Sequence, residues 1–471
     1  MRFNQPLFFF VLLTLVAAAR LCHVEILWAE ETLPLAAAEQ VLHGKTLYRD
    51  VWFDKPPLVA AVNLLWGARD SWPLRLAGAL YQLLACWLAF RFARDLWSPA
   101  EGYWAAGLVG FFLTFDFPSA VIPLASDLLL VVPHLAAVWL AWKRRPFASG
   151  LWLGVGFLIS PKALLVAAVC AVWYPSGVFW MAAGFLAASG VATLWLAAAG
   201  ALPSYWDQVW RWGRVYASTP SLDRPVWNAM VRTADWAGFH IALLAAASWY
   251  FGSGRKAGEP PAPRLWAGWC GLSLMAVATG FRFFPRYYFF LLPPLALAAA
   301  RGSTLLGRRR VWIALLLLIP LARFGPRYAL LAARHIDWVD TSMDRDSRSA
   351  AAVARPLAHL GSTLFVWGFR PELYVYTGLP AATRFLDSQP LTGVPADRHL
   401  TQSTPVETIF ARAHRGELAR SSPTFVMDGL GLYNPRLAIT QFPELAEWFS
   451  HYREVGRVAG TVIYQVIPAP P

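Results

Sequence analysis

The sequence predicts a mainly α-helical, polytopic membrane protein with about eleven transmembrane helices and a C-terminal extracytoplasmic α/β domain. Of its 471 residues, 57% are hydrophobic and only 15% are charged, and the mean hydropathy is +0.43. Soluble globular chains do not reach this balance. Apolar runs of membrane-spanning length recur as far as Pro326, whereas residues 327–471 mix charged residues with short β-type runs. We therefore expect a transmembrane domain over 1–326 and a second domain over 327–471.

A membrane-spanning helix needs roughly 20 mostly apolar residues. The sequence contains about eleven runs of roughly this length. With the N-terminus in the cytoplasm, the basic clusters of the even-numbered turns all fall on the cytoplasmic side, as the positive-inside rule requires. An odd number of spans puts loops 28–72 and 201–236 and everything after Pro326 outside. The runs lie near 5–27, 73–92, 101–118, 121–142, 147–161, 163–176, 178–200, 237–252, 265–281, 284–300 and 311–325.

The formal charge of +13 lies almost wholly in the membrane half. Up to Pro326 there are 27 Lys and Arg against 15 Asp and Glu, a net charge of +12. Basic residues in such loops set topology and meet lipid phosphate. Membrane lipids, and not nucleic acid, are therefore the expected partners of this charge.

The expected outer regions carry their own secondary structure. Residues 33–40 and 205–216 place apolar residues on one face and polar ones on the other, which is typical of helices lying in the membrane interface. Beyond Pro326, strand-like runs at 363–367, 424–427 and 461–466 alternate with helical patterns at 403–419 and 443–452. This order indicates a small α/β domain.

The first outer loop, 28–72, holds the richest set of polar residues. Two adjacent carboxylates, Glu30 and Glu31, follow the first span, and Asp54-Lys55-Pro56-Pro57 comes later in the loop. Charged groups so close to the membrane are expensive to desolvate and are often functional. The alternative is that the two glutamates only begin a helix, where Glu31 would be favourable in the first turn. Spacing alone does not separate these interpretations.

The order of these motifs resembles the first extracytoplasmic loop of GT-C, lipid-phosphate-sugar-dependent glycosyltransferases. The bacterial branch with the lipid A aminoarabinose transferases and relatives of protein O-mannosyltransferases is the most similar. The resemblance implies that the loop acid positions or deprotonates the acceptor and that Asp54 and Lys55 lie in the same cavity. The family usually has Asp-Glu where this chain has Glu30-Glu31, which leaves open which glutamate faces the reaction.

Two later segments agree with the resemblance. Residues 280–295 resemble the Pro-Arg-Tyr…Leu-Pro-Pro segment of these enzymes and contain Arg286 and Tyr287. Lys162 and Asp127 lie at outer helix ends, where relatives often carry a lysine and an acid. The resemblance implies a substrate-binding role for these four residues and for Lys55, and a catalytic role for Glu30, Glu31 and Asp54. The alternatives are interfacial snorkelling for Arg286 and a buried polar role for Asp127.

Nucleotide cofactors and structural zinc are not expected, since phosphate-binding Gly-rich fingerprints and metal-ligand spacings are missing from the sequence. Asp54 and one acid of the Glu30-Glu31 pair could offer hard oxygen ligands to a divalent metal ion. The spacing does not establish such a site.

The function expected from these features is a membrane glycosyltransferase. It would move a sugar from a polyprenyl-phosphate donor to a lipid, glycan or protein acceptor on the outer side of the cytoplasmic membrane, by an inverting single displacement. A transporter or flippase of lipid-linked sugars is one alternative, although the chain has no visible repeat. A non-catalytic family member acting in envelope glycan assembly is another.

Overall fold

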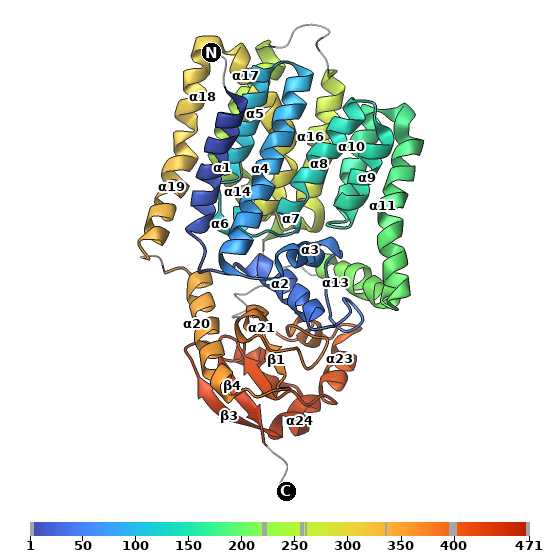
Figure 1. Cartoon of the computed structure of the whole chain (residues 1–471), viewed down its shortest axis with the longest axis vertical. Coiled ribbons are helices and arrows are strands. Elements are labelled where there is room, and N and C mark those ends of the chain that lie inside the picture. Colours follow the sequence, from blue (N-terminus) through green and yellow to red (C-terminus); the bar gives the residue numbers. More distant parts are fainter. Residues whose placement is uncertain are drawn as a thin grey trace.

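The computed structural model describes residues 4–218, 224–254, 259, 261–334, 337–394 and 403–467. A bundle of helices occupies one end of the molecule and a small sheet the other, with α2, α3 and α13 between them (Figure 1). The N-terminus and α18 lie at the end of the bundle opposite the sheet (Figure 1). The two parts therefore form the two ends of one elongated molecule.

Each of the eleven apolar runs coincides with a helix or a broken helix. Proline at the first positions sets several helix starts, as at Pro99, Pro146 and Pro263, because its missing N–H has no helical partner there in any case. The helices of the bundle are α1 (Gln5–Leu21), α4 (Ser71–Leu96), α5 (Pro99–Phe112), α6 (Pro118–Val121), α7 (Ser126–Leu129), α8 (Val131–Trp142), α9 (Pro146–Phe157), α10 (Ala163–Trp173), α11 (Val178–Ala198), α14 (Pro225–Phe239), α15 (Ile241–Trp249), α16 (Pro263–Ala278), α17 (Leu292–Leu305), α18 (Val311–Leu316) and α19 (Leu318–Ala332).

Many helices of the bundle are too short to cross a membrane on their own. Among the described residues, only Ser71–Leu96 and Pro175–Ala198 are long and apolar enough to cross a membrane alone. The pair Gly307–Leu316 and Leu318–Ala332, bent by 41°, is a third candidate. The chain is thus mainly helical with membrane-type helices, and the count of eleven spans stays a prediction.

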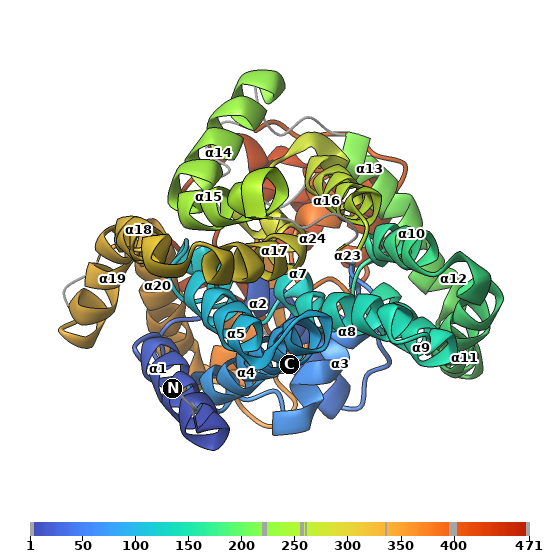
Figure 2. The ribbon, with the colours of Figure 1, turned by 90° about the horizontal axis from the view of Figure 1, so that it is seen from above.

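Small residues let the helices of the bundle pack closely. A Cβ atom on Gly150 of α9 would lie 2.0 Å from the carbonyl oxygen of Met181 in α11. In the same way, a Cβ on Gly302 of α17 would lie 1.9 Å from the carbonyl oxygen of Ala246 in α15. Helices in lipid associate largely through such close contacts. Seen from above, α17 lies inside the bundle, with α1, α11 and α19 at its periphery (Figure 2).

The segments between the bundle and the sheet are α2 (Ala29–Leu42), α3 (Leu58–Ala61), α12 (Leu202–Tyr205), the π-helical turn η3 (Trp206–Arg211) and α13 (Trp212–Ser218). The expectation of an interface helix with one exposed face at 33–40 is wrong. Leu33, Leu35 and Gln40 are all buried, because the α/β part covers the side of α2 that would otherwise face solvent. The expected outer loop at 201–236 is also shorter, since α14 begins at Pro225.

The sheet has the order β1-β2-β4-β3, with β1 and β2 parallel and the other pairs antiparallel. The three expected strands are confirmed. The helix expected at 443–452 is shorter, since a strand, β3, begins at Tyr452. The helix expected at 403–419 begins only at Ala411. The elements are α20 (Val339–Ala354), β1 (Leu364–Trp367), α21 (Glu372–Thr377), α22 (Gln389–Thr392), α23 (Ala411–Leu418), β2 (Phe425–Asp428), α24 (Ala446–Ser450), β3 (Tyr452–Arg457) and β4 (Val462–Val466).

Hydrogen bonds join the α/β part to the first outer loop. The amide of Ala381 donates to Gln40 Oε1 (2.7 Å), and the amide of Trp52 donates to the carbonyl oxygen of Arg384 (2.6 Å). The helix α19 continues through Pro326 to Ala332, so the chain leaves the bundle a few residues after the change in composition. The contacts hold the α/β part directly against the loop that carries Glu30.

Candidate functional site

A cavity of about 510 Å³ lies where the bundle, the first outer loop and the α/β part meet. Seven of the eight predicted site residues line it, although they come from five separate stretches of chain. They are Glu30, Asp54, Lys55, Asp127, Lys162, Arg286 and Tyr287. Glu31 is not among the lining residues.

The centre of the cavity is a three-residue charge cluster. Arg286 Nη2 lies 2.9 Å from Glu30 Oε1, and Arg286 Nε lies 3.3 Å from Asp127 Oδ2. Glu30 and Asp127 each occupy the first turn of a helix, α2 and α7, where the helix dipole favours negative charge. The side chains of Glu30 and Arg286 keep 29% and 18% of their surface exposed, so a ligand entering the cavity can reach them.

Lys162 approaches the same cluster from the start of α10. Its Nζ lies 3.4 Å from the centre of the Tyr287 ring and 3.9 Å from Asp127 Oδ1, and it makes no hydrogen bond. Burial lowers the pKa of Lys162 below its usual value, and the nearby Arg286 lowers it further. A lysine with a cation–π partner but no hydrogen-bond acceptor still has N–H groups available for a ligand.

Lys55 and Asp54 form a second charged pair, 3.4 Å apart, on the outer loop. Although burial alone would lower the pKa of Lys55, the carboxylates of Asp54 and Glu30 raise it above its usual value. The hydroxyl of the buried Tyr48 donates to the carbonyl oxygen of Lys55 (2.7 Å), and Gln208 of η3 donates to the carbonyl oxygen of Tyr48 (2.7 Å). Through these two hydrogen bonds, η3 fixes the position of the Asp54-Lys55 turn.

Glu31 lies in a different environment. Its side chain is 2% exposed and forms an ion pair with Arg75 of α4, which is 1% exposed. Arg75 Nη1 donates to Glu31 Oε2 (3.0 Å), and the amide of Trp28 donates to Glu31 Oε1 (3.0 Å). This carboxylate connects the start of α2 to α4.

Several lining residues were missed from the sequence, four of which bear on the chemistry of the cavity. Arg282 and Tyr216 lie near the charge cluster, and Phe369 and Gln389 reach the cavity from the α/β part. Arg282 could have been found, since it is the other arginine of the segment that carries Arg286. Nothing in the sequence indicates that Phe369 and Gln389 meet residues more than 300 positions earlier.

The residues that could hold a divalent ion take part in ion pairs. No group of three or more His, Cys, Asp or Glu side chains suited to a metal occurs in the described part of the chain. Glu30 and Asp127 are paired with Arg286, and Asp54 with Lys55. These carboxylates are paired with cations in this structure, and a divalent ion at Asp54 and the Glu30-Glu31 pair stays a prediction.

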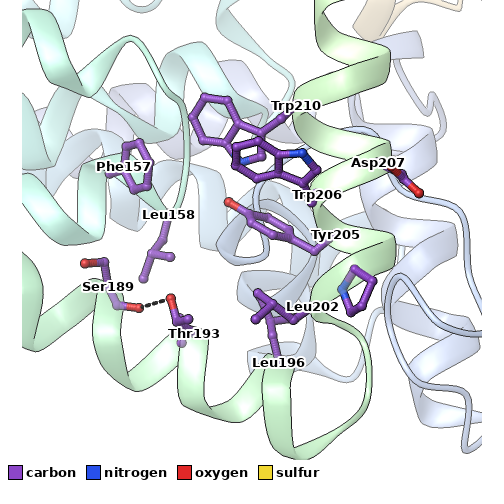
Figure 3. A pocket seen from close by; sticks show the side chains of 12 residues that line it. Phe157, Leu158, Ser189, Thr193, Leu196, Leu202, Tyr205, Trp206, Asp207 and Trp210 are labelled. Atoms are coloured by element: carbon purple, nitrogen blue, oxygen red, sulfur yellow. Dashed lines mark hydrogen bonds between the residues drawn. The ribbon is translucent and has the colours of Figure 1, made fainter.

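A second, mainly apolar cavity of about 610 Å³ lies beside the first, between α9, α11 and η3. Tyr205, Trp206 and Trp210 face Phe157 and Leu158 across it, while Ser189 and Thr193 lie on α11 (Figure 3). Leu158 lines this cavity, whereas the next residue, Ile159, lines the polar one. Likewise, Trp210 lines the apolar cavity and Val209 the polar one. Neighbouring residues of the same two segments thus line the two cavities.

The fold is similar to that of known membrane enzymes. ArnT from Cupriavidus metallidurans bound to undecaprenyl phosphate matches with a TM-score of 0.59 and 14% identity, over 98% of each chain. Its apo state matches with a TM-score of 0.56 and 14% identity, over 97% of this chain and 96% of that chain. The archaeal oligosaccharyltransferase AglB from Archaeoglobus fulgidus, in complex with an inhibitory peptide and a dolichol-phosphate, matches with a TM-score of 0.49 and 11% identity. The match covers 99% of this chain and 75% of that chain.

No protein-family model matches the sequence, and no curated protein matches it either. At 14% identity the structural likeness to ArnT establishes the fold and not the activity. The chain therefore shares the fold of ArnT, which agrees with the resemblance of the loop at 28–72.

Proposed function

We propose that this protein is a membrane glycosyltransferase that uses a polyprenyl-phosphate-linked sugar as its donor. The observation that carries the proposal is the meeting of Glu30, Arg286, Asp127 and Lys162 in one cavity that adjoins an apolar groove. A donor of this class has a sugar, an anionic phosphate and a long hydrocarbon chain. The two adjoining cavities offer an environment for each of these parts, on a fold that ArnT shares.

Glu30 is assigned as the general base. Its Oε1 pairs with Arg286, and Oε2 would accept the proton of the acceptor's nucleophilic group as the freed electron pair attacks the anomeric carbon. The bond between that carbon and the phosphate oxygen breaks, and the phosphate leaves with the electron pair. A single displacement inverts the anomeric carbon and needs only one base.

The cations of the cavity would stabilise the departing phosphate. Lys162 has ammonium hydrogens without acceptors, and Arg286 and Lys55 lie within the same cavity. Preorganised positive groups at the site of developing charge lower the barrier, because they need no rearrangement during the reaction. Tyr287, against which Lys162 packs, and Asp127 would hold these cations in place.

The apolar groove of Figure 3 would take the hydrocarbon chain of the donor. Its walls are aromatic and aliphatic, with Trp206 54% exposed at the surface of the bundle. Burying hydrocarbon there contributes roughly 25 cal/mol per Å². The groove would let the lipid remain in the membrane while its phosphate enters the polar cavity.

The site is proposed to face the outer side of the cytoplasmic membrane, with residues 327–471 outside as well. Two exposed serines can test this orientation in a cysteine-free background: Ser349 on α20 and Ser176 between α10 and α11. A membrane-impermeant maleimide should label Ser349→Cys in intact cells and should label Ser176→Cys only after permeabilisation. The reverse pattern would contradict the orientation.

Sugar transfer by the purified protein is the decisive experiment. The protein in detergent should convert a polyprenyl-phosphate sugar to free polyprenyl phosphate when cell-envelope extract supplies the acceptor. Thin-layer chromatography of radiolabelled donor would measure this conversion. A transporter or an assembly partner would leave the donor intact, and that result would refute the proposal.

A further inference from the structure

The charged side chains that line the polar cavity do not balance. Three carboxylates, those of Glu30, Asp54 and Asp127, face four cations. Arg286, Lys55 and Lys162 each lie within 4.0 Å of one of these carboxylates. Arg282 is the fourth cation, and no carboxylate of the described residues lies within that distance of it. The described lining therefore carries one positive charge without a counter-ion.

Arg282 is buried and held in a fixed position. Its side chain is 4% exposed, and its guanidinium carbon lies 3.7 Å from the centre of the Tyr216 ring. Nη2 donates to the carbonyl oxygen of Tyr216 (2.8 Å), whereas Nε is buried with no hydrogen-bond partner. Buried polar atoms are nearly always hydrogen-bonded, so an unpartnered Nε beside a cavity indicates a missing ligand.

The backbone supports this position. The carbonyl oxygen of Arg282 accepts a hydrogen bond from Arg232 Nη1 (2.6 Å). Phe281 and Phe283, on either side of Arg282, have φ values of 53° and 49°. Such values are unfavourable for residues with a bulky side chain and persist only where the surrounding structure enforces them. Arg282 is thus held against Tyr216 instead of extending into solvent.

We propose that Arg282, packed on Tyr216, binds the phosphate group in this cavity together with the cations that stabilise its departure. A guanidinium presents several N–H donors in one plane, which fits the oxygens of a phosphate better than an ammonium does. A phosphodiester carries a single negative charge, which equals the charge left over in the lining. Arg286 differs from Arg282 because two carboxylates already occupy its donors.

Tyr216 connects this position to the proposed reaction centre. Burial raises the pKa of the Tyr216 hydroxyl, and Arg282, Lys55 and Arg286 partly oppose that rise. Tyr216, on which Arg282 packs, lines the same cavity as Glu30, Lys55 and Arg286, so a phosphate bound at Arg282 would lie in the cavity that holds the proposed base. The inference depends on the proposed function only for the lipid that carries the phosphate.

Binding measurements on the full-length protein in detergent test the site without requiring turnover. Undecaprenyl phosphate, undecaprenol and inorganic phosphate are titrated into the unmutated protein and into Arg282→Ala, Arg282→Lys and Arg323→Ala. Arg323→Ala removes an exposed arginine outside the cavity and serves as the matched control. We expect Arg282→Ala to bind undecaprenyl phosphate at least tenfold more weakly, with undecaprenol binding unchanged. Arg282→Lys should lose at least threefold.

The pattern also identifies the source of the phosphate. A loss confined to undecaprenyl phosphate assigns the group to the lipid carrier, and a loss that extends to inorganic phosphate assigns the site to phosphate in general. Thermal melting checks that each variant is folded, and Arg282→Lys decides the question if Arg282→Ala unfolds.

Undiminished binding of both phosphate ligands by folded variants would overturn the proposal. Arg282-dependent binding by a protein that never consumes a donor would refute the proposed function alone. Normal donor use and normal binding by Arg282→Ala would refute this inference alone.

Discussion

Glu30 and Glu31 are neighbours in sequence, and each pairs with an arginine, yet their surroundings are opposite. The Glu31–Arg75 pair is 2% and 1% exposed, between α2 and α4. The Glu30–Arg286 pair is 29% and 18% exposed, in the wall of a cavity of about 510 Å³. Consecutive residues on a helix point in directions about 100° apart. One carboxylate can therefore stabilise the fold while the next one meets a ligand.

The two ion pairs also differ in how many of their polar atoms have hydrogen-bond partners. Arg75 donates to both oxygens of Glu31 and to the carbonyl oxygens of His23 and Ile26. A buried ion pair is tolerated only with such additional hydrogen bonds, because desolvation of the charges is costly. Arg286 contacts one oxygen of Glu30 and one of Asp127. The second pair thus leaves oxygen atoms free for a substrate.

The largest expected effect is on activity, from Glu30→Gln. Glutamine keeps the shape and an oxygen near Arg286 but cannot accept the acceptor's proton. Turnover should fall roughly 10²–10⁴-fold, the usual loss on removing a general base, with an unchanged melting temperature. Glu25→Gln, which alters an exposed carboxylate, is the control. Normal turnover by Glu30→Gln would show that Glu30 is not the base.

Glu31→Gln should act on stability instead. Removing one partner leaves Arg75 buried with an uncompensated charge, which typically costs about 3–5 kcal/mol. Thermal or denaturant unfolding would measure this loss. Turnover per folded molecule should stay within a few-fold of normal. A Glu31→Gln protein that melts normally but is inactive would exchange the roles of the two glutamates.

A third carboxylate, Asp387, sharpens the comparison because it is buried and forms no ion pair with the described residues. Its side chain is 4% exposed, and no basic group in the described ranges forms an ion pair with it. Burial raises the pKa of Asp387 to about 7, and the charge of Asp54 adds to this rise. Hydrogen bonds with Gln389 and the charge of Lys55 oppose it.

The pH dependence follows from this raised pKa. The folded state favours the protonated form of Asp387. The contribution of this residue to stability is therefore complete below its ordinary pKa near 3.8 and is lost as the pH rises to about 7. Asp387→Asn removes this titration. The free energy of unfolding of this variant, minus that of the unmutated protein, should be about 2 kcal/mol larger at pH 8 than at pH 5. A constant difference across that range would contradict the assignment.

The smallest effect is expected from Arg286→Lys. Lysine keeps the positive charge but contacts Glu30 and Asp127 less well than a planar guanidinium. Turnover should fall roughly tenfold, about 1.4 kcal/mol, with little change in melting temperature. Arg75→Lys is the matched variant, and it should lower stability more than turnover. Equal losses of stability in both variants would remove the distinction between the two pairs.

Local sequence patterns predicted much of the fold and part of the site. Apolar runs of sufficient length gave helices at all eleven places, and alternating β-branched and aromatic runs gave β1, β2 and β4. The strand β3 was missed because its Tyr-Arg-Glu-Val-Gly-Arg sequence is mostly polar and exposed. Its partner β4 defines it as a strand through hydrogen bonds that the local pattern does not encode.

By itself, the sequence determined where helices form, where charge concentrates and which polar residues stand at helix ends. Hydrophobic length and periodicity are local properties, so they can be read one segment at a time. Only the tertiary structure decided that Arg75 meets Glu31 and that Arg286 joins Glu30 to Asp127. It likewise decided that no carboxylate among the described residues forms an ion pair with Arg282. Each of these outcomes depends on the distance between groups far apart in the chain. Electrostatic interactions fall off with that distance in space, and the packing of the helices sets it.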